Sequence, residues 1–498
     1  MPFGDFQTFL AELESREQLR RIRVEVDPIL EITEIADRVS NLPAAGGGRA
    51  PATDPVHGGL GGYALLFEKV KGSAIPLAIN TYGSYERMKL ALGCADLESL
   101  ADRIEQLTKP ELPTTLMEKV KKLPDLMKLA GFAPKIVPRG ICQEVVHEDD
   151  ANLFDLPVLQ CWPEDGGRFI TFGGMYTKDP ETGERNVGMY RAQLFGPKRT
   201  AMHWHVHHDG ARHFRGWSKR NEPMPLAIVF GGEPVLPYAA TCPLPPGVSE
   251  LLLAGFLQGK GIELVRCRTI PLEVPANAEI VVEGTVDPKE TVLEGPFGDH
   301  TGFYSLPDHY PVFRVTAITH RRECVFPATI VGKPPQEDYY LGKATERVFL
   351  PLLRMLIPDV LDYHLPMFGA FHNCVFVKIR KAYPYQARKV MHGIWGAGQM
   401  MLSKFIVVVD EGVNVHDEQD VLFHVGANVD PRRDTVIVEG PLDILDHAAP
   451  ACGAGSKMGI DATRKIAGEG VVRGWPEELE MSEAIRRQVT RRWEEFGL

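Results

Sequence analysis

The chain of 498 residues lacks the features that mark secreted and membrane-spanning proteins. Its eight cysteines are scattered singly without a C-x-x-C pair, which argues against a disulfide framework or a zinc ribbon and favours a reducing compartment. Asp5, Glu12 and Glu14 lie where a signal peptide would be basic and then apolar. No apolar run approaches the ~18 residues that cross a bilayer. We therefore expect a cytoplasmic protein that is at most peripheral to a membrane.

The sequence also lacks long blocks of like charge. Its 55 basic and 66 acidic residues give a net charge of -11 that is spread along the chain, so we do not expect nucleic acid as a partner. Neither the G-x-S-x-G elbow of serine hydrolases nor the H-E-x-x-H of zinc proteases occurs. The length and the 44% hydrophobic content predict a large globular protein of about three domains.

The first part of the chain alternates between helical and strand periods. Apolar residues recur at helical spacing over 6–13, alternate like a strand over 22–26, and return to the helical period over 32–39. These patterns predict a small α/β domain over residues 1–112. The Gly- and Pro-rich segment 43–62 can hold neither a helix nor a strand and is expected to be a loop.

Short strands dominate the middle of the chain after a predicted helical linker that begins near residue 112. They include 280–282 and 313–317, and they predict a β-rich domain over 113–328. Residues 332–335, Gly-Lys-Pro-Pro, can continue neither a helix nor a strand, so we place a hinge there.

Beyond the hinge, helical periods alternate with apolar strands such as 405–409, which predicts an α/β domain over 329–475. Ile485, Val489 and Trp493, each four residues apart, form one apolar stripe on a terminal helix over 476–498, a kind of helix that often packs on another subunit. The fold class expected for the whole chain is α+β.

Five histidines crowd into eleven residues: His203, His205, His207, His208 and His213. Imidazole is the commonest transition-metal ligand in proteins, so this density indicates a site. On a strand the first three would share one face, and Trp204 would point the other way. A hard ion such as Mn²⁺ or Mg²⁺ also needs oxygen donors, for which Asn186 and Glu250 are candidates. Zinc bound by three histidines and a metal-free, hydrogen-bonded strand are the alternatives.

A second group of candidate residues lies in the turn 294–302, Glu-Gly-Pro-Phe-Gly-Asp-His-Thr-Gly. If Glu294 and Asp299 converge on one cavity, repulsion and burial would raise the pKa of one carboxyl enough for proton donation near neutrality. An arginine between them would hold a substrate carboxylate and keep the other acid ionised. The alternative is a plain surface loop.

Several motifs in one order resemble the UbiD family of decarboxylases. They are Asn186-Val-Gly-Met-Tyr-Arg191, Met202-His-Trp, His207-x-x-Gly-Ala211, Glu294-Gly-Pro-Phe-Gly-Asp299-His-Thr-Gly302, Gly332-Lys-Pro-Pro335 and Gly455-Ser-Lys-Met-Gly-Ile-Asp-Ala-Thr463. The match runs from about residue 5 to 465. This resemblance implies a central split β-barrel that binds prenylated FMN, with a C-terminal α/β domain across a hinge.

The resemblance also implies individual roles. Asn186, His207 and Glu250 resemble ligands of a Mn²⁺ ion, often joined by K⁺, that bridges the cofactor phosphate to the protein. Arg191 and Glu294 resemble the inner pair of the catalytic network, and Asp299 its terminal proton donor. The other positions at which the family contacts the cofactor, largely through the backbone, correspond to Met189, Tyr190, His203, Trp204, His205, His208, Asp209 and Lys404, and Arg191 is among the cofactor-binding positions as well.

The family catalyses the reversible, non-oxidative decarboxylation of aromatic or α,β-unsaturated acids. The resemblance therefore implies a carboxy-lyase for a hydroxybenzoate or hydroxynaphthoate precursor of ubiquinone or menaquinone. It further implies a flavin prenyltransferase as cofactor supplier and a homo-oligomer, either a dimer or a hexamer. The alternatives are a decarboxylase of another aromatic, heteroaromatic or α,β-unsaturated acid, a metal-dependent hydrolase, and a non-catalytic flavin- or metal-binding protein.

Overall fold

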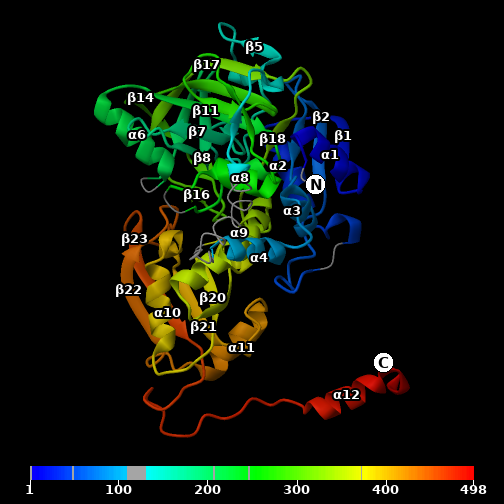
Figure 1. Cartoon of the computed structure of the whole chain (residues 1–498), viewed down its shortest axis with the longest axis vertical. Helices are drawn as coiled ribbons and strands as arrows, with labels where there is room; N and C mark the ends of the chain where they lie inside the picture. The colour runs from blue at the N-terminus through cyan, green and yellow to red at the C-terminus, as the bar shows by residue number, and fades with distance from the viewer. Residues whose placement is uncertain are drawn as a thin grey trace, which may run out of the picture.

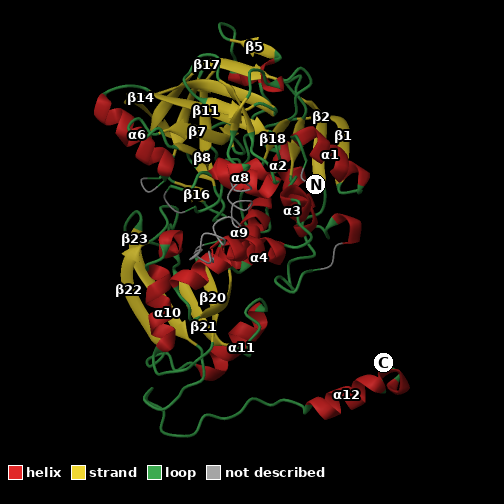
Figure 2. Cartoon of the chain, viewed as in Figure 1, coloured by secondary structure: helices red, strands yellow, loops and turns green. Residues whose placement is uncertain are grey.

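The computed structural model describes residues 3–47, 50–108, 130–205, 208–244, 247–371 and 373–497. Figure 1 shows an upper part that holds the large central sheet and the N-terminal elements, a lower part with a second sheet, and a C-terminal arm that runs out from the body. Helices and strands are mixed throughout (Figure 2), which confirms the predicted α+β class. Among the described residues, no helix is both long and apolar enough to span a membrane.

The N-terminal part is a mixed sheet covered by helices. Its elements are α1 (Phe6–Ser15), β1 (Leu19–Val26), α2 (Glu31–Ser40), β2 (Ala64–Val70), β3 (Leu77–Ile79), α3 (Tyr85–Leu92) and α4 (Leu97–Thr108). The predicted helix, strand and helix over 6–39 are confirmed as α1, β1 and α2. A distant strand, β18 (Phe326–Ala328), completes the sheet in the order β1-β2-β3-β18. The chain thus returns to the N-terminal sheet just before the hinge.

Helix α1 illustrates why the sequence pattern was informative. Asp5 caps the helix by accepting a hydrogen bond from the backbone N–H of Thr8 at 2.8 Å. The four apolar residues at helical spacing, Phe6, Phe9, Leu10 and Leu13, are all buried. In β1, by contrast, Val24 is 68% exposed, because this strand lies at the edge of its sheet.

The central part is an antiparallel sheet that curls into a half barrel (Figure 2). Its strands are β5 (Val145–His147), β6 (Phe169–Ile170), β7 (Gly174–Lys178), β8 (Arg185–Met189), β9 (Arg191–Gly196), β10 (Arg199–His203), β11 (Met224–Gly231), β14 (Ala278–Glu294) and β17 (Asp308–His320). The strands predicted over 280–282 and 313–317 lie within β14 and β17. These two long strands pair with each other along most of their length and lie at the centre of the sheet.

Shorter elements surround this half barrel. They are β4 (Lys135–Ile136), α6 (Asp209–Arg220), α7 (Val235–Ala239), α8 (Glu250–Gln258), β12 (Glu263–Arg266), β13 (Glu273–Pro275), β15 (Phe297–Gly298) and β16 (Tyr304–Ser305). The hairpin of β15 and β16 directly follows β14, so it holds the turn 294–302 against the mouth of the half barrel.

The C-terminal part is a five-stranded sheet in the order β19-β20-β21-β23-β22. Its elements are α9 (Glu337–Leu356), β19 (Val360–His364), β20 (Cys374–Ile379), α10 (Gln386–Trp395), β21 (Phe405–Asp410), α11 (Glu418–Asn428), β22 (Thr435–Pro441) and β23 (Ala454–Asp461). The strand predicted over 405–409 is confirmed as β21. Helix α9 leads from the predicted hinge into this sheet and packs against α3 and α4 of the N-terminal part.

The chain ends in α12 (Glu483–Arg491), at the tip of the arm in Figure 1. The helix begins seven residues later than the predicted start at 476. None of its residues is buried, and Ile485, Val489 and Trp493 are 42%, 37% and 50% exposed. The domain boundaries 1–112, 113–328, 329–475 and 476–498 stay a prediction.

The Gly- and Pro-rich loop has a structural role that its composition did not reveal. Asp54 is buried, and its Oδ2 accepts hydrogen bonds from the hydroxyls of Tyr85 at 3.2 Å and Tyr339 at 2.9 Å. His57 Nε2 lies 3.6 Å from the carboxylate of Glu418. Since these partners belong to α3, α9 and α11, the loop joins the N-terminal part to the C-terminal part.

Candidate active site

The guanidinium of Arg191 lies buried between two carboxylates. Its Nε and Nη2 donate to Glu294 at 2.8 and 3.1 Å, Nη1 donates to Asp299, and Nη2 also donates to the hydroxyl of Ser305 at 2.9 Å. The guanidinium carbon lies 4.6 Å from the ring centre of Phe297. The structure therefore brings together the predicted Arg191, Glu294 and Asp299, and their roles in catalysis stay a prediction.

The backbone holds the turn that carries the two acids. The carboxylate of Asp165 accepts the N–H groups of Gly298 at 2.7 Å and Trp162 at 2.8 Å, and Gln193 accepts the N–H of Gly295 at 2.7 Å. A side chain at position 298 would meet the Trp162 indole at 2.1 Å, so only glycine fits. These contacts explain why the motif combines glycines with its acids.

The charges of this group differ from the expectation. Burial alone would raise the pKa of Asp299, but the hydrogen bond and charge of His300, together with Arg191, hold it well below its usual range. Burial would also raise the pKa of Glu294, and hydrogen bonds from His203 and Arg191 lower it instead. The prediction that repulsion raises one of the two pKa values is therefore wrong for this structure, because His300 and Arg191 stabilise the charge of Asp299 while His203 and Arg191 stabilise that of Glu294.

His300 is a site residue to which the sequence analysis gave no role. Its backbone N–H and its Nδ1 lie 2.8 and 2.9 Å from Oδ1 of Asp299. Burial would lower the pKa of this imidazole, but the hydrogen bond and charge of Asp299 raise it to about 8. Its position next to the acid in the motif was the available signal. Ser305, which accepts from Arg191, and Tyr310, whose ring centre lies 4.2 Å from that of His203, also belong to the site, and nothing in their sequence context marked them.

The histidine-rich segment does not continue as a strand. Strand β10 ends at His203, whose Nδ1 lies 3.0 Å from Glu294 and whose Nε2 lies 3.1 Å from Nε2 of His205. The rings of His205 and His208 stack with centres 4.8 Å apart. The expected alternation of faces is therefore wrong beyond His203, because the chain turns towards α6 there. His207 lies outside the described residues.

Two of the three predicted metal ligands lie close to each other. The backbone N–H of Val187, next to Asn186 on β8, donates to Glu250 at the start of α8 at 3.0 Å. Burial raises the pKa of Glu250 to about 7, and the charges of Asp209 and Glu184 add to this effect. None of the ion pairs among the described residues includes Glu250, and the buried amide nitrogen of Asn186 has no hydrogen-bond partner. A hard cation binds oxygen donors, so it would be held by the half-buried carboxylate of Glu250 and by the amide oxygen of Asn186 rather than by this nitrogen.

The other predicted cofactor-binding positions fall into two places. Tyr190, Trp204 and His208 pack together: the Tyr190 ring lies 5.2 Å from that of His208 and 6.4 Å from that of Trp204. Met189 precedes them on β8, and Asp209 follows at the start of α6, where it pairs with Arg212 at 3.0 Å. Lys404 lies in the C-terminal part and pairs with Asp446 at 2.8 Å, away from this cluster.

A cluster of possible metal ligands that was not predicted lies at α9, the helix that follows the predicted hinge. Carboxylate and imidazole atoms of Glu346, His364 and His416 lie within 4.8 Å of one another, and all three side chains are buried. However, the ammonium of Lys343 lies 2.6 Å from Glu346 and 2.8 Å from Nδ1 of His364. The ammonium of Lys343 therefore already serves as the cation of this cluster. We assign the cluster a structural role at the contact between α9 and the C-terminal sheet.

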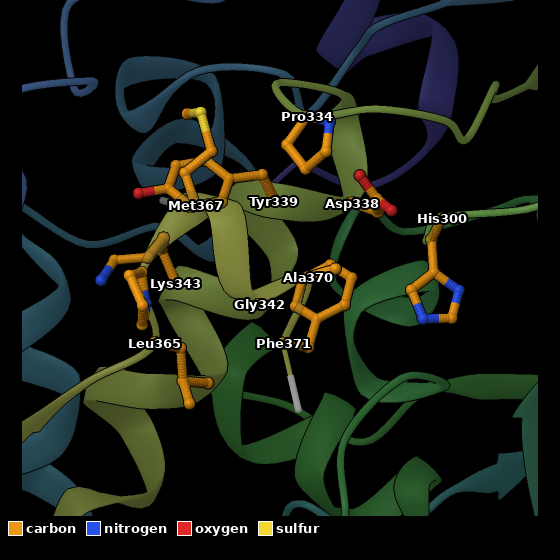
Figure 3. Close-up of a pocket in the computed structure, with 11 residues that line it drawn as sticks. His300, Pro334, Asp338, Tyr339, Gly342, Lys343, Leu365, Met367, Ala370 and Phe371 are labelled. Atoms are coloured by element: carbon orange, nitrogen blue, oxygen red, sulfur yellow. The ribbon is translucent and has the colours of Figure 1, made fainter. Parts of the chain in front are cut away.

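A cavity separates the turn after Asp299 from the hinge helix (Figure 3). His300 lines one side, Asp338 and Lys343 of α9 line another, and Pro334, Met367 and Phe371 supply apolar walls.

Three family models match the chain in order. They describe 3-octaprenyl-4-hydroxybenzoate carboxy-lyase: its N-terminal domain matches residues 10–107, its Rift-related domain 135–334 and its C-terminal domain 339–462. An uncharacterized protein of Aquifex aeolicus is 49% identical over 100% of this chain and 99% of its own length. An uncharacterized protein of Archaeoglobus fulgidus is 46% identical, with the same coverage.

Solved structures are similar along the whole chain. An evolved dimeric form of the UbiD-class enzyme HmfF from Pelotomaculum thermopropionicum, in complex with prFMN, has a TM-score of 0.77 at 26% identity, covering 97% of this chain and 98% of that one. Vanillic acid decarboxylase of Sedimentibacter hydroxybenzoicus in its closed form has a TM-score of 0.84 at 27% identity, covering 100% and 99%. Its open form scores 0.77 at 26% identity, covering 100% of both chains.

The family models follow the order of the three structural parts, and both relatives match from end to end. The acidic turn and the arginine between its carboxylates lie within the matched Rift-related domain. This chain therefore belongs to the UbiD family of carboxy-lyases and is a decarboxylase of that class.

Proposed function

We propose that this protein catalyses the reversible, non-oxidative decarboxylation of an aromatic carboxylic acid with prenylated FMN. The observation that carries the proposal is the buried Arg191 held between two ionised carboxylates, one of which also contacts His300 on the wall of a cavity. Such a group can bind the carboxylate of a substrate and can donate or accept one proton. A decarboxylation requires both of these steps. The complex of HmfF with prFMN supports the choice of cofactor.

Loss of CO₂ leaves an electron pair on an sp² carbon. Prenylated FMN, when bound, supplies the electron sink for this pair. Arg191 orients the substrate carboxylate, and Glu294 holds the guanidinium in place through two hydrogen bonds. Once the substrate carboxylate replaces Asp299 on Arg191, the pKa of Asp299 rises because only His300 then opposes the effect of burial. Asp299 can then carry the proton to the carbon that lost CO₂.

The residues around β8 and α6 would hold the cofactor. Asn186, His207 and Glu250 would bind Mn²⁺, with K⁺ as a second ion, and the ions would hold the cofactor phosphate. The carboxylate of Glu250 beside β8, whose pKa is raised by burial and by neighbouring acids, supports this assignment because a bound cation would compensate its charge. We also propose that a flavin prenyltransferase supplies the cofactor and that the C-terminal part closes over the flavin and seals the reacting carbon from water. The vanillic acid decarboxylase of Sedimentibacter hydroxybenzoicus, which has both a closed and an open form, supports such a movement.

The substrate we propose is a hydroxybenzoate or hydroxynaphthoate precursor of a quinone. A ring hydroxyl para or ortho to the carboxylate pushes electrons towards the carbon that must be protonated. The apolar walls formed by Pro334, Met367 and Phe371 suit a planar ring, and the polar groups of Asp338 and Lys343 suit its hydroxyl. Vanillic acid decarboxylase, a structural neighbour, acts on a hydroxylated benzoate. Another aromatic or heteroaromatic acid is the second candidate.

A substrate panel tests this function. Protein produced together with a flavin prenyltransferase should release CO₂ from hydroxybenzoates or hydroxynaphthoates, and solvent deuterium should appear at the ring carbon that lost the carboxylate. Reaction with cinnamates or pyrrole-type acids alone would contradict the quinone-precursor assignment and leave the decarboxylase assignment intact. Absence of CO₂ release from every acid, with the cofactor bound, would contradict the proposed function.

Substitution of Asp299 by Asn should keep the bound cofactor and lower turnover by ~10² or more, because the amide keeps the shape but carries no titrating proton. Cofactor absorbance and CO₂ release measure the two effects separately. Asp308→Asn is the matched control. Asp308 is exposed, and it lies opposite Glu294 in the register of β14 and β17. Turnover of the Asp299 variant within about twofold of wild type would rule out its role as the acid.

Substitution of Glu250 by Gln should release both the divalent metal and the flavin. The amide still accepts the hydrogen bond from Val187 but loses the charge that an ion requires. Metal analysis and the flavin spectrum of the purified protein measure the loss. Glu263→Gln, at an exposed position, is the control, and His205→Ala should lose less than the Glu250 variant. Retention of full metal content by Glu250→Gln would contradict the assignment.

We also propose that α12 packs on a second copy of the chain. Its apolar stripe is exposed, and the arm holds it away from the body (Figure 1). The dimeric form of HmfF supports self-association. Val489→Glu combined with Trp493→Glu should shift the mass measured by light scattering to that of a single chain, whereas Thr490→Glu, on the polar face, should not. An unchanged mass in the double variant would exclude α12 from the interface.

A further inference from the structure

Both oxygens of Asp299 are occupied in the structure. Oδ2 accepts from Arg191, and Oδ1 accepts from the backbone N–H and the imidazole of His300. A carboxylate held in this way can receive a proton only when one of its donors gives one up or moves away. Each decarboxylation consumes one proton, so a neighbour of Asp299 that can give up a proton is a candidate for its supply. Arg191 cannot supply it, since a guanidinium stays protonated in proteins.

His300 lies where it can supply this proton to Asp299. Its Nδ1 faces Asp299, and its ring lines the cavity next to Phe371, with ring centres 5.7 Å apart (Figure 3). The side chain is 19% exposed, whereas that of Asp299 is 11% exposed. The imidazole therefore stands between the buried acid and the space from which water can reach it.

The charged groups around His300 favour its protonated form. Asp299 faces it from its own turn, Asp338 from the first turn of α9, and Asp443 from the segment after β22. Arg191 lies beyond Asp299, and Lys343 lines the far side of the cavity. The three acids raise the pKa of His300 to about 8 against the effect of burial. Near neutrality the imidazole thus holds a proton that it can pass on.

We propose that His300 is a positioning residue that reprotonates Asp299 in each catalytic cycle. The inference rests on the proposed decarboxylase function. When the bond to the carboxyl carbon breaks, its electron pair stays on the ring carbon, and CO₂ leaves. The proton of Asp299 then forms the new C–H bond, Nδ1–H of His300 passes its proton to Asp299, and the imidazole takes a proton from water in the cavity. The cycle consumes one proton for each CO₂ released.

The pairing can be tested without cofactor or turnover. Histidine ¹³C NMR of the purified chain, with the signal assigned by its absence in His300→Gln, should show His300 titrating near pH 8. In Asp299→Asn the titration should move down by about one unit or more, because the charge that favours the imidazolium is gone. A titration that does not move in Asp299→Asn would overturn the pairing, whatever the substrate of the enzyme is.

Kinetics then test the relay. Wild-type turnover should fall as pH rises through about 8, where the imidazole loses its proton. His300→Asn keeps a hydrogen-bond donor but cannot titrate, so it should lose this alkaline limb and about 10² in turnover. Added imidazole should restore part of the rate to His300→Ala. His392→Asn, at an exposed position on α10, should behave like wild type.

The outcomes separate a relay from a structural role. If His300→Asn keeps the alkaline limb, or if imidazole leaves His300→Ala unchanged, the relay is wrong. If the wild-type protein turns over no acid at all, the proposed function fails and the relay fails with it. The NMR titration would still decide whether Asp299 and His300 form a pair.

Discussion

The buried ion cluster around Arg191 is the interaction on which the site depends. A single guanidinium holds Glu294 from the end of β14 and Asp299 from the turn after β15, so it joins elements that would otherwise repel each other. A buried arginine without partners, or two buried carboxylates without a cation, would be strongly destabilising. The cluster therefore sets both the geometry of the acidic turn and the ionisation of its two acids.

The two acids of this cluster are not equivalent. Glu294 accepts two hydrogen bonds from Arg191 and faces His203, whereas Asp299 meets Arg191 through one guanidinium nitrogen. An incoming carboxylate that competes for the guanidinium will displace the less strongly held partner. This asymmetry explains why one acid can remain a fixed anchor while the other changes its protonation state, although both have lowered pKa values in the absence of substrate.

Sequence patterns predicted much of the fold because periodicity reports burial. The helical spacing of Phe6, Phe9 and Leu13 and the apolar run 405–409 were sufficient for α1 and β21. The residues of the site were found through motifs. Their charges were not, because the lowered pKa values depend on tertiary contacts with His203, His300 and Arg191, and the arginine approaches from β9, about a hundred positions away in the chain. The end of β10 at His203 was also not predicted, and the side chain of His203 meets Glu294 of β14 there.

The loop that buries Asp54 has a mechanical consequence. It ties α3 to the hinge helix α9 and reaches α11 of the C-terminal sheet through His57. A second, non-covalent connection therefore joins the two parts beside the predicted hinge at 332–335. If the C-terminal part moves about that hinge as we propose, wide opening would have to separate His57 from Glu418, so this contact would favour the closed arrangement.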